Sequence, residues 1–392
     1  MTTKNAYKQT EVGLIPEDWE CKDLQHYFSF ISYGFTNPMP TVSEGVYMIT
    51  ANDVNEGRIK FETARKTTEE AYKYLLSDKS RPKKNDILLT KDGSLGRLAL
   101  VGDEKICINQ SVAVIRPNDK IYPLFLKLLL EDTYYQRTMI DNAGGSTIKH
   151  IYITIVNKMQ VGIPPTKAEQ TTIATALSDA DALISSLEKL IAKKRMMKQG
   201  AMQKLLMVNC QLSIDNGGWE VKKLGDVCDI RKGQLITEST RINGYIPVIA
   251  GGKTPAYYHN KPNRFGKTIT ISGSGASAGY VSFHNYPIFA SDCSTIEESD
   301  TYSIEFIFYL MQLFQDKIYK MQTGGAQPHI HPSDLNPILI PIPINQEEQT
   351  RIATILSDMD AEISALETKL EKYKKVKLGM MQNLLTGKIR LV

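Results

Sequence analysis

The segment Gln170-Thr-Thr-Ile-Ala-Thr-Ala-Leu-Ser-Asp-Ala-Asp-Ala182 returns 179 residues later as Gln349-Thr-Arg-Ile-Ala-Thr-Ile-Leu-Ser-Asp-Met-Asp-Ala361. The two copies align without a gap as far as Leu206 and Leu385, and 21 of these 37 positions are identical. Self-similarity at one fixed offset marks a structural unit that the chain uses more than once. The sequence therefore predicts a domain and a helix, followed by a second domain and a second helix.

Apolar or small residues in each copy recur at alternating steps of four and three. In the first copy they are Ile173, Leu177, Ala180, Ile184, Leu187 and Ile191; in the second they are Ile352, Leu356, Met359, Ile363 and Leu366. Such a heptad seam is buried only against another helix. We predict two long helices, over residues 167–208 and 345–392, each about 60 Å long at about 1.5 Å per residue, which pair as an antiparallel coiled coil related by a pseudo-twofold axis.

Two alternatives remain for these helices. Each helix can instead pack only on its own domain. Both helices also end in basic clusters, Lys193-Lys194-Arg195 with Lys198 and Lys372 with Lys374, Lys375 and Lys377. Cations suit a helix C-terminus, so these clusters are either a solvated face or a contact for phosphate or a partner.

The two globular segments, 1–166 and 209–344, share a plan despite their divergence. Each opens on a tryptophan, Trp19 or Trp219, and each ends in a strand punctuated by proline, 161–165 or 339–344. Each also contains a strand that ends in a Gly/Ser turn, followed by a Gly-Gly element (Gly144-Gly145 and Gly324-Gly325). These are short strands that end in turns. We predict an α+β fold in which two mixed α/β domains are joined by the two long helices.

The charge is small and evenly divided. The chain has 392 residues, is 42% hydrophobic and 23% charged, and carries a formal net charge of +4. Residues 1–165 hold 21 basic and 20 acidic side chains, and residues 217–344 hold 11 of each. Charge alone thus gives no sign of nucleic-acid binding, because neither segment is strongly basic. A polar N-terminus and the lack of an apolar run of about 18 residues favour a cytoplasmic protein, and five scattered cysteines read as ordinary thiols.

Motifs for catalysis are missing. Gly273-Ser-Gly-Ala-Ser-Ala278 matches a dinucleotide fingerprint, but strand-like residues follow it instead of a helix, so we interpret it as a turn. The sequence has no phosphate-binding loop and no Asn-Pro-Pro-aromatic tetrapeptide of an amino-methyltransferase. His329 and His331 lack a third or fourth metal ligand nearby. We predict a chain with no catalytic residues, no metal and no cofactor of its own.

The whole chain resembles the specificity (S) subunits of type I restriction–modification systems. The strings that carry the likeness are Glu11-Val-Gly-Leu-Ile-Pro-Glu-Asp-Trp-Glu20, the helix entries Ile163-Pro-Pro-Thr-Lys-Ala-Glu-Gln170 and Ile342-Pro-Ile-Asn-Gln-Glu-Glu-Gln349, and the helix exits Lys204-Leu-Leu206 and Asn383-Leu-Leu-Thr-Gly-Lys388. The resemblance implies that each domain is a target-recognition domain reading one half of a bipartite, asymmetric site in double-stranded DNA, in the major groove. It implies that the coiled coil sets the spacer.

The resemblance also implies partners and their cofactors. Two methyltransferase (M) subunits would dock on the chain and bring S-adenosylmethionine for adenine N6 methylation. Restriction (R) subunits, if the system has them, would use ATP and Mg²⁺ to cleave the DNA. All catalysis would then lie outside this chain. A protein-interaction scaffold without DNA is the alternative, and a self-sufficient nuclease or methylase is a third hypothesis.

Candidate contacts with DNA surround the two turns and follow the two Gly-Gly elements. They are Lys91, Ser94, Arg97, Lys149 and His150 in the first domain, and Ser272, Ser274, Ser277, Gln327 and His329 in the second. Polar side chains of these types can reach phosphates and base edges, although such turns can also simply connect strands. Candidates for the helix seam or a subunit interface are Ile173, Leu177, Ile184, Leu187, Ile352, Leu356, Ile363 and Leu366.

Overall fold

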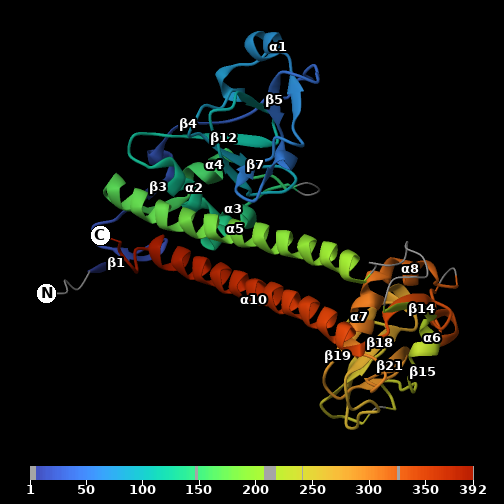
Figure 1. Cartoon of the computed structure of the whole chain (residues 1–392). Helices are drawn as coiled ribbons and strands as arrows, with labels where there is room; N and C mark the ends of the chain where they lie inside the picture. Colours follow the sequence, from blue (N-terminus) through green and yellow to red (C-terminus); the bar gives the residue numbers. More distant parts are fainter. Residues whose placement is uncertain (1–5, 146–148, 207–217, 241, 325–326, 392) are drawn as a thin grey trace. The chain divides into compact units, whose positions relative to one another are not determined.

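The structure is a computed structural model, and it describes residues 6–145, 149–206, 218–240, 242–324 and 327–391. The chain divides into two compact units (Figure 1). Unit 1 comprises Met1–Ser186 and Leu370–Val392, and unit 2 comprises Leu187–Lys369. The division falls inside both long helices, whereas the sequence suggested boundaries at residues 166/167 and 344/345. Residues 207–217, where the second domain was expected to begin, lie outside the described residues.

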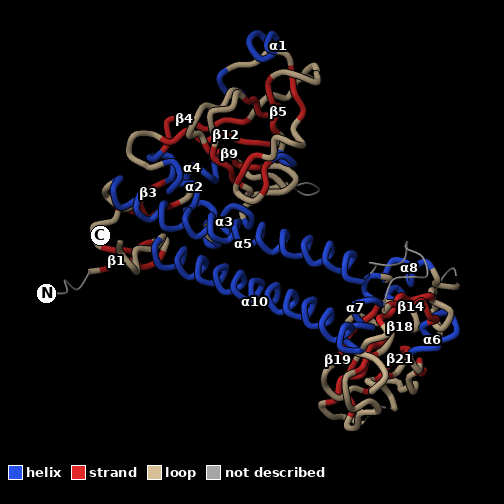
Figure 2. Tube along the Cα trace, in the orientation of Figure 1, coloured by secondary structure: helices blue, strands red, loops and turns tan. Residues whose placement is uncertain are grey.

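Two long helices are present, α5 (Lys167–Leu206, 40 residues) and α10 (Gln346–Leu384, 39 residues), each uninterrupted (Figure 2). Both begin shortly after a proline, which blocks a helix from extending backwards. After α10 the chain turns at Gly387, which has φ +69°. A Cβ there would lie 2.5 Å from the ring of Pro16, so only glycine fits.

Ion pairs show that the helices run antiparallel within each unit. In unit 1, Lys377 near the end of α10 reaches Asp181 near the start of α5 at 2.5 Å. In unit 2, Lys198 near the end of α5 reaches Asp360 near the start of α10 at 2.6 Å. The second pair is the first shifted by the repeat offset of 179. The predicted antiparallel pairing is therefore confirmed, and the basic clusters form part of it.

Two further ion pairs in unit 2 use the same basic cluster, Lys194–Glu362 and Arg195–Glu367, both at 2.6 Å. These cations face carboxylates of the other helix, so they are not simply a solvated surface. Exposed pairs of this kind each contribute at most about 1 kcal/mol, and the register of the two helices is their main consequence.

The globular part of unit 1 holds two small sheets. The first has the strand order β10-β9-β12-β4 and the second the order β11-β5-β8. Their bounds are β4 (Phe28–Tyr33), β5 (Val46–Ile49), β8 (Arg65–Thr67), β9 (Ile87–Thr90), β10 (Leu98–Leu100), β11 (Ile106–Ile108) and β12 (Val112–Pro117). Helices α2 (Pro123–Glu131), α3 (Thr133–Asp141) and α4 (Ile153–Lys158) pack between these strands and α5 (Figure 1). A short helix α1 (Glu69–Tyr74) and the strand pair β6 (Val54–Asn55) and β7 (Arg58–Ile59) complete it.

Unit 2 repeats this topology. Its sheets have the orders β19-β18-β21-β15 and β17-β16-β20, with the same parallel and antiparallel pairings as in unit 1. The strands are β15 (Ile230–Lys232), β16 (Ile246–Ile249), β17 (Tyr257–His259), β18 (Thr268–Ser272), β19 (Val281–His284), β20 (Phe289–Ala290) and β21 (Cys293–Glu297). The helices are α6 (Leu224–Val227), α7 (Ile304–Leu313), α8 (Gln315–Lys320) and α9 (Pro332–Leu335). The divergent halves thus share one fold.

A short antiparallel strand pair closes each domain next to its long helix. It joins β3 (Glu20–Asp23) to β13 (Gln160–Ile163) in unit 1, and β14 (Trp219–Lys223) to β22 (Leu339–Pro343) in unit 2. Unit 1 has in addition an N-terminal hairpin, β1 (Tyr7–Thr10) and β2 (Gly13–Pro16). The strand predicted over 339–344 is confirmed as β22, with its prolines inside it, whereas the strand predicted over 161–165 is β13, which ends at Ile163 before the two prolines.

The N-terminal hairpin and the C-terminal tail meet in unit 1. The Tyr7 hydroxyl donates to the carbonyl oxygens of Gly387 and Lys388, each at 3.3 Å. The guanidinium of Arg390 donates to the carboxylate of Asp18 at 3.0 and 3.1 Å and to Glu169 Oε2 at 2.7 Å. Both ends of the chain are therefore needed to complete this unit.

The cores explain the heptad seam. The core of unit 1 contains Ile173 and Leu177 of α5 together with Met381 of α10 and Leu385, the first residue after α10. The core of unit 2 contains the repeat counterparts Ile352 and Leu356 together with Met202 and Leu206. The four isoleucine and leucine side chains are at most 6% exposed. They belong to the core of their own unit and are not accessible to another subunit. Leu187 and Ile363 are also buried, and Ile184 and Leu366 are half-buried.

The described residues contain no helix long and apolar enough to cross a membrane. They also contain no group of three or more His, Cys, Asp or Glu side chains arranged to hold a metal ion. Four cysteines are free thiols, and Cys210 lies outside the described part of the chain. Burial raises the pKa of Cys107, Cys228 and Cys293 to about 12, so these thiols stay protonated at neutral pH.

Candidate nucleic-acid interface

In unit 1, the turn after β9 lies against the segment that follows the Gly-Gly element. Asp92 and His150 face each other across an isolated bridge, and the amide of Ile151 donates to the carbonyl of Lys91 at 3.0 Å. The ammonium of Lys91 lies 2.6 and 2.7 Å from the two Asp92 oxygens and 4.8 Å from the centre of the Tyr33 ring. His150 Nδ1 lies 2.5 Å from Asp92 Oδ1.

Within this cluster the carboxylate of Asp92 compensates the charge of Lys91. Partial burial of Asp92 opposes its ionisation, but hydrogen bonds from Lys91 and His150 outweigh burial and hold the pKa of Asp92 below its ordinary value. The carboxylate is therefore charged at neutral pH and compensates the Lys91 ammonium, whose side chain is only 13% exposed. The turn of unit 1 thus offers little free positive charge to a ligand.

In unit 2, the turn after β18 has the same backbone frame with different side chains. Ser274 bridges His329, and the amide of Ile330 donates to the carbonyl of Gly273 at 3.0 Å. The hydroxyl of Ser274 donates to Asp292, and the His329 ring stacks on His331 with ring centres 6.3 Å apart.

We call each turn with its facing histidine a turn-and-histidine frame. The frame of unit 1 contains Lys91, Asp92 and His150, and these residues correspond to Gly273, Ser274 and His329 in the frame of unit 2. Gly93 and Gly275 have φ angles of +73° and +78°, a conformation that glycine adopts without strain. The dinucleotide-like string is a turn between the antiparallel strands β18 and β19, as predicted.

The Gly-Gly elements match with a shift of one residue from the alignment that the sequence suggested. Gly145 corresponds to Gly324, and both have positive φ (+114° and +91°). The bridge partners Gly144 and Thr323 are likewise 179 residues apart. Sequence comparison alone aligned the glycine pairs with each other and missed this register.

Each frame lies beside a hollow. The hollow of unit 2, about 380 Å³, is lined by Lys232, Ser274, Asp292, Gln327, His329 and His331 among others. The hollow of unit 1, about 480 Å³, is lined by Phe35, Met48, Asn52, Asn109 and Gln110 among others, and also by the charged side chains of Asp53 and Arg65. Ser111 ties the turn of unit 1 to this wall, because its carbonyl accepts from Lys91 N at 2.9 Å and its hydroxyl donates to Asn109 Oδ1 at 2.6 Å.

The structure separates the predicted candidates into three groups. Lys91 meets His150 through Asp92, with the exposed Lys149 next in sequence, and Ser274, Gln327 and His329 line one hollow. Ser94 and Ser277 lie within their turns and line neither hollow. Arg97 and Ser272 have structural roles. The guanidinium of Arg97 donates to the carbonyl of Val54 at 3.4 Å, and the buried Ser272 hydroxyl donates to the carbonyl of Gly251 at 2.7 Å.

Sequence reasoning missed Asp92, Asp292 and Lys232. Asp92 neutralises the adjacent Lys91 and also contacts His150, 58 residues away, and Asp292 accepts from Ser274, 18 residues away, so only the fold brings these groups together. Lys232 had a usable signal, because residues 233–267 contain five basic side chains and a single acid. Charge counted over a whole domain conceals that signal.

The Glu-Gln pairs at the helix entries have matching structural roles. Gln170 accepts from Tyr122 N at 2.7 Å and donates to the carbonyl of Pro164 at 3.1 Å. Gln349 repeats both bonds, with the amide of Ser303 at 2.9 Å and the carbonyl of Pro343 at 2.8 Å. Each buried glutamine therefore ties the first turn of α2 or α7 to the start of a long helix.

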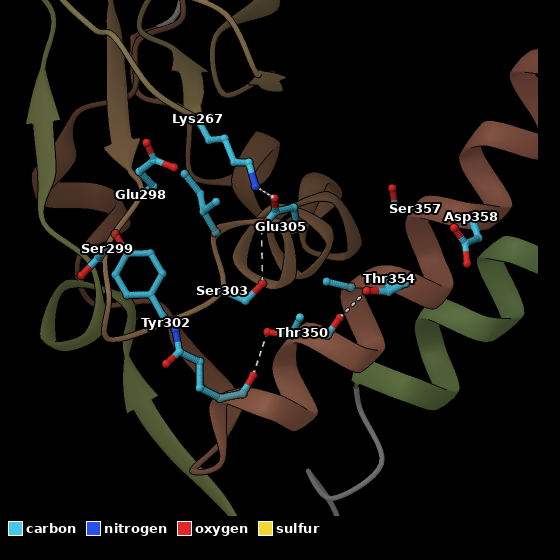
Figure 3. A pocket seen from close by; sticks show the side chains of 13 residues that line it. Lys267, Glu298, Ser299, Tyr302, Ser303, Glu305, Thr350, Thr354, Ser357 and Asp358 are labelled. Atoms are coloured by element: carbon cyan, nitrogen blue, oxygen red, sulfur yellow. Dashed lines mark hydrogen bonds and ion pairs between the residues drawn. The ribbon is translucent and has the colours of Figure 1, made fainter.

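A second surface lies at the start of α10 in unit 2, where a cavity of about 420 Å³ opens between α10 and the start of α7 (Figure 3). Lys267 and Glu305 form an ion pair of 2.5 Å on one side. Thr350, Thr354, Ser357 and Asp358 line the other side (Figure 3).

The residues on the α10 side of this cavity recur unchanged in α5. The repeat offset of 179 relates Thr350, Thr354, Ser357 and Asp358 to Thr171, Thr175, Ser178 and Asp179. Of the eight side chains, seven are exposed and Ser178 is half-exposed. We call these eight residues the repeated polar stripe. Because exposed side chains that pack on nothing are free to diverge, their identity in both copies indicates a shared contact.

Comparison with known proteins identifies a family by sequence, and solved structures share the fold. The family model "Type I restriction modification DNA specificity domain" matches residues 16–194 and again 216–376. The type I restriction enzyme MjaVIII specificity subunit of Methanocaldococcus jannaschii is 28% identical over 428 residues, covering 98% of this chain and 96% of that protein.

Two solved structures share the fold. The type I restriction–modification S subunit from M. genitalium aligns with a TM-score of 0.66 at 19% identity, over 93% of this chain and 96% of that one. A chain from a study of complex assembly and conformational transition of the type I R-M system aligns with a TM-score of 0.62 at 17% identity, over 96% and 99%. With two matched domains, a full-length relative and the same fold, this chain belongs to the family of type I restriction–modification DNA specificity domains.

Proposed function

We propose that this chain is the DNA specificity subunit of a type I restriction–modification complex, with each globular domain reading one half of a bipartite, asymmetric DNA site in the major groove. The observation that carries this proposal is the pair of matching turn-and-histidine frames, which hold different side chains on one shared backbone. A reader of sequence needs that division, because backbone geometry positions the protein on phosphates while variable side chains discriminate base edges.

The helices complete the division of labour. The two domains have diverged, whereas α5 and α10 keep 21 identical residues in 37 positions. Divergent readers on nearly constant helices fit a site with two unlike halves and a gap whose length the helix pair sets. A helix of 40 residues extends roughly 60 Å, more than one duplex turn of about 35 Å.

The repeated polar stripe supports two copies of one partner. We propose that one methyltransferase subunit docks at the copy in α5 and another at the copy in α10. Those subunits would bind S-adenosylmethionine and methylate adenine N6, and restriction subunits would bring ATP and Mg²⁺. Catalysis would take place on these partner subunits, in the cytoplasm, where the DNA is. This chain would determine the DNA sequence at which they act.

The function is tested by co-expressing the chain with its cognate methyltransferase subunit and mapping methyladenine by single-molecule sequencing. We expect a motif of two short halves separated by a fixed gap, which disappears when this chain is omitted. Methylation by the chain alone would favour a self-sufficient enzyme. A complex that forms but neither methylates nor binds DNA would favour the protein-interaction scaffold.

The docking of two partners is tested by charge reversal in the stripe, with the mass of the purified complex measured by light scattering. Asp179→Lys or Asp358→Lys alone is expected to remove one methyltransferase subunit, and the double variant both. Thr172→Glu is the matched control, because Thr172 is exposed on the same helix and its counterpart is Arg351. Equal loss with Thr172→Glu, or no loss with the double variant, would contradict docking at the stripe.

A further inference from the structure

One segment of unit 2, residues 231–267, is far more basic than the rest of its domain. It contains seven Lys and Arg residues and one acid, Glu238. The remainder of residues 217–344 contains four basic and ten acidic residues. A domain that is neutral as a whole is therefore polarised, and we call residues 231–267 the basic segment.

Part of this charge is already neutralised inside the unit. Arg231 pairs with Asp229 at 2.6 Å, Arg264 with Glu297 at 3.2 Å and Lys267 with Glu305 at 2.5 Å. The other three lysines of the basic segment, Lys232, Lys253 and Lys261, are exposed. Within the described part of the chain, none of these three lysines has a carboxylate at ion-pair distance. Their charges are available to an external anion.

Two of the free lysines lie beside the turn-and-histidine frame of unit 2. Lys232 ends β15 and lines the same hollow as Ser274 and His329. Lys253 lies two residues after Gly251, whose carbonyl accepts the hydrogen bond from Ser272 at the end of β18. The ammonium of Lys253 lies 5.1 Å from the centre of the Tyr280 ring. The free charge therefore borders the candidate reading surface.

Exposed apolar side chains accompany the lysines in this segment. Leu235, Tyr245 and Phe265 are 77%, 95% and 72% exposed. Apolar and aromatic groups interleaved with cations suit a nucleic-acid surface, where bases and sugars offer apolar contacts between phosphates.

The counterpart segment of unit 1 lacks this imbalance. Between Ser32 and Asn85, which match Arg231 and Lys267 in the shared fold, it contains nine basic and seven acidic residues. Four of these cations have acidic partners within the domain, among them Lys60–Glu56 at 3.6 Å and Lys84–Asp103 at 2.8 Å. The other five stand among acids in the sequence, so that the segment has a net charge of +2, against +6 for residues 231–267. The two units thus differ in the charge that they offer to a polyanion.

We infer that Lys232, Lys253 and Lys261 form a phosphate-binding anchor for duplex DNA, so that unit 2 supplies most of the electrostatic binding and unit 1 contributes mainly selectivity. The inference rests on the proposed function and assigns the DNA backbone to one surface. Each phosphate that the protein neutralises releases condensed counterions, and the slope of log K against log salt concentration counts those contacts.

The test uses the complex reconstituted with its methyltransferase subunits. Its affinity is measured between 50 and 200 mM KCl, as conditions of roughly that range resolve the slope, for a duplex with the mapped motif and for one with the motif scrambled. For the triple variant Lys232→Ala/Lys253→Ala/Lys261→Ala, we expect the slope to fall by about 2 to 3 and the affinity for both duplexes to weaken roughly 10- to 100-fold. The bases methylated are expected to stay the same.

Two controls separate charge from structure. The triple Lys→Arg variant keeps the charges and is expected to keep the slope. Lys223→Ala removes an exposed lysine of the same domain outside the basic segment, and is expected to change nothing.

Three outcomes would overturn the anchor. The first is an unchanged salt slope in a folded triple Ala variant, and the second is an equal effect of Lys223→Ala. The third is a triple variant that no longer assembles with the methyltransferase subunits but keeps its DNA affinity, which would assign the surface to a protein partner.

Failure of the proposed function would appear in the unmodified complex, which would then methylate no bipartite motif, whatever the salt slope of the variants.

Discussion

The turn-and-histidine frames of the two units share one backbone but place their charged side chains differently. In unit 1 the carboxylate of Asp92 lies on the turn itself and neutralises Lys91. In unit 2 the turn residue is Ser274, the acid is Asp292 on the next segment, and Lys232 lines the hollow without an acidic partner among the described residues. A repeat can therefore keep its fold and change what it offers to a ligand by moving one carboxylate.

This difference teaches that the average charge of a domain says little about its binding surface. Both domains are close to neutral by composition. Only in unit 2 are the charges sorted, with cations in residues 231–267 and acids elsewhere. Four experiments test whether the two units differ in this way.

Exchange of a whole domain gives the largest expected effect. Replacing residues 1–166 by the matching segment of a relative should replace one half of the methylated motif entirely and leave the other half and the gap unchanged, because the helices are retained. Replacing 209–344 should do the converse. Single-molecule sequencing of methyladenine provides the measurement, and a chimera that alters both halves at once would refute two independent readers.

Removal of a buried acid should destabilise unit 1 strongly. The carboxylate of Asp86, 1% exposed, accepts from Arg116 Nε at 2.9 Å and from its second nitrogen at 2.7 Å. Asp86→Ala leaves a cation without its partner, which costs about 3 to 5 kcal/mol. The counterpart in unit 2 is Thr268, and Thr268→Ala should cost only about 1 kcal/mol.

Hydrogen exchange resolved by peptide distinguishes the two units in this experiment. Asp103→Ala serves as the control, because its ion pair with Lys84 is exposed and worth less than about 1 kcal/mol. Loss of protection confined to unit 1 is expected for Asp86→Ala. Equal sensitivity at Thr268 would show that the two sheets do not differ in this way.

Acidification should weaken unit 2 selectively. Burial lowers the pKa of His284 in β19 to about 4, from an ordinary value of 6.5. Because the folded pKa is depressed, the neutral ring contributes stability that is complete above pH 6.5 and declines as the pH falls toward 4. Between pH 7 and pH 5 the loss is on the order of 2 kcal/mol.

Val101 occupies the position of His284 in unit 1 and does not titrate. Hydrogen exchange at pH 7 and pH 5, corrected for intrinsic rates, should show β18 and β19 losing protection while β9 and β10 keep theirs. His284→Val should remove the difference between the units. If its loss of protection with acid is undiminished, another group is responsible.

Removal of the acid from the turn of unit 1 gives the smallest effect. Asp92→Ser should free Lys91 for a phosphate, which raises the salt slope of DNA binding by roughly 1 and the affinity for a scrambled duplex a few-fold. Lys91→Ala in the same chain should cancel the gain. Asp103→Ser, which removes an exposed acid of the same unit, is the matched control, and a gain of the same size there would mean that only net charge matters.

Local pattern predicts much of this fold. The heptads and the prolines predict the long helices and the strands that precede them, because each of these signals acts within a few residues. The Gly/Ser turns are predictable for the same reason. The repeat at an offset of 179 residues extends these predictions to the second copy. The contacts that finish each unit are not, since Arg390 binds Glu169 across 221 residues.

The candidate site was predictable only in position. Sequence placed Lys91 and Ser274 at the two turns and His150 and His329 after the two Gly-Gly elements, and the structure brings each turn to its histidine. It did not reveal that Asp92 cancels Lys91, because an adjacent acid forms an ion pair only if the backbone turns both side chains the same way. Arg97 and Ser272 look equally suited to bind DNA in sequence, yet the fold turns both toward backbone carbonyls.

The closure of unit 1 by both ends of the chain has a consequence for its biosynthesis. Unit 2 is one continuous stretch, Leu187–Lys369, and all of its residues have been made before translation ends. Unit 1 awaits Met381, Leu385 and Arg390. The domain that leaves the ribosome first is therefore completed after the second, and a chain that stops just after Lys369 would lack residues that unit 1 needs while unit 2 has all of its own.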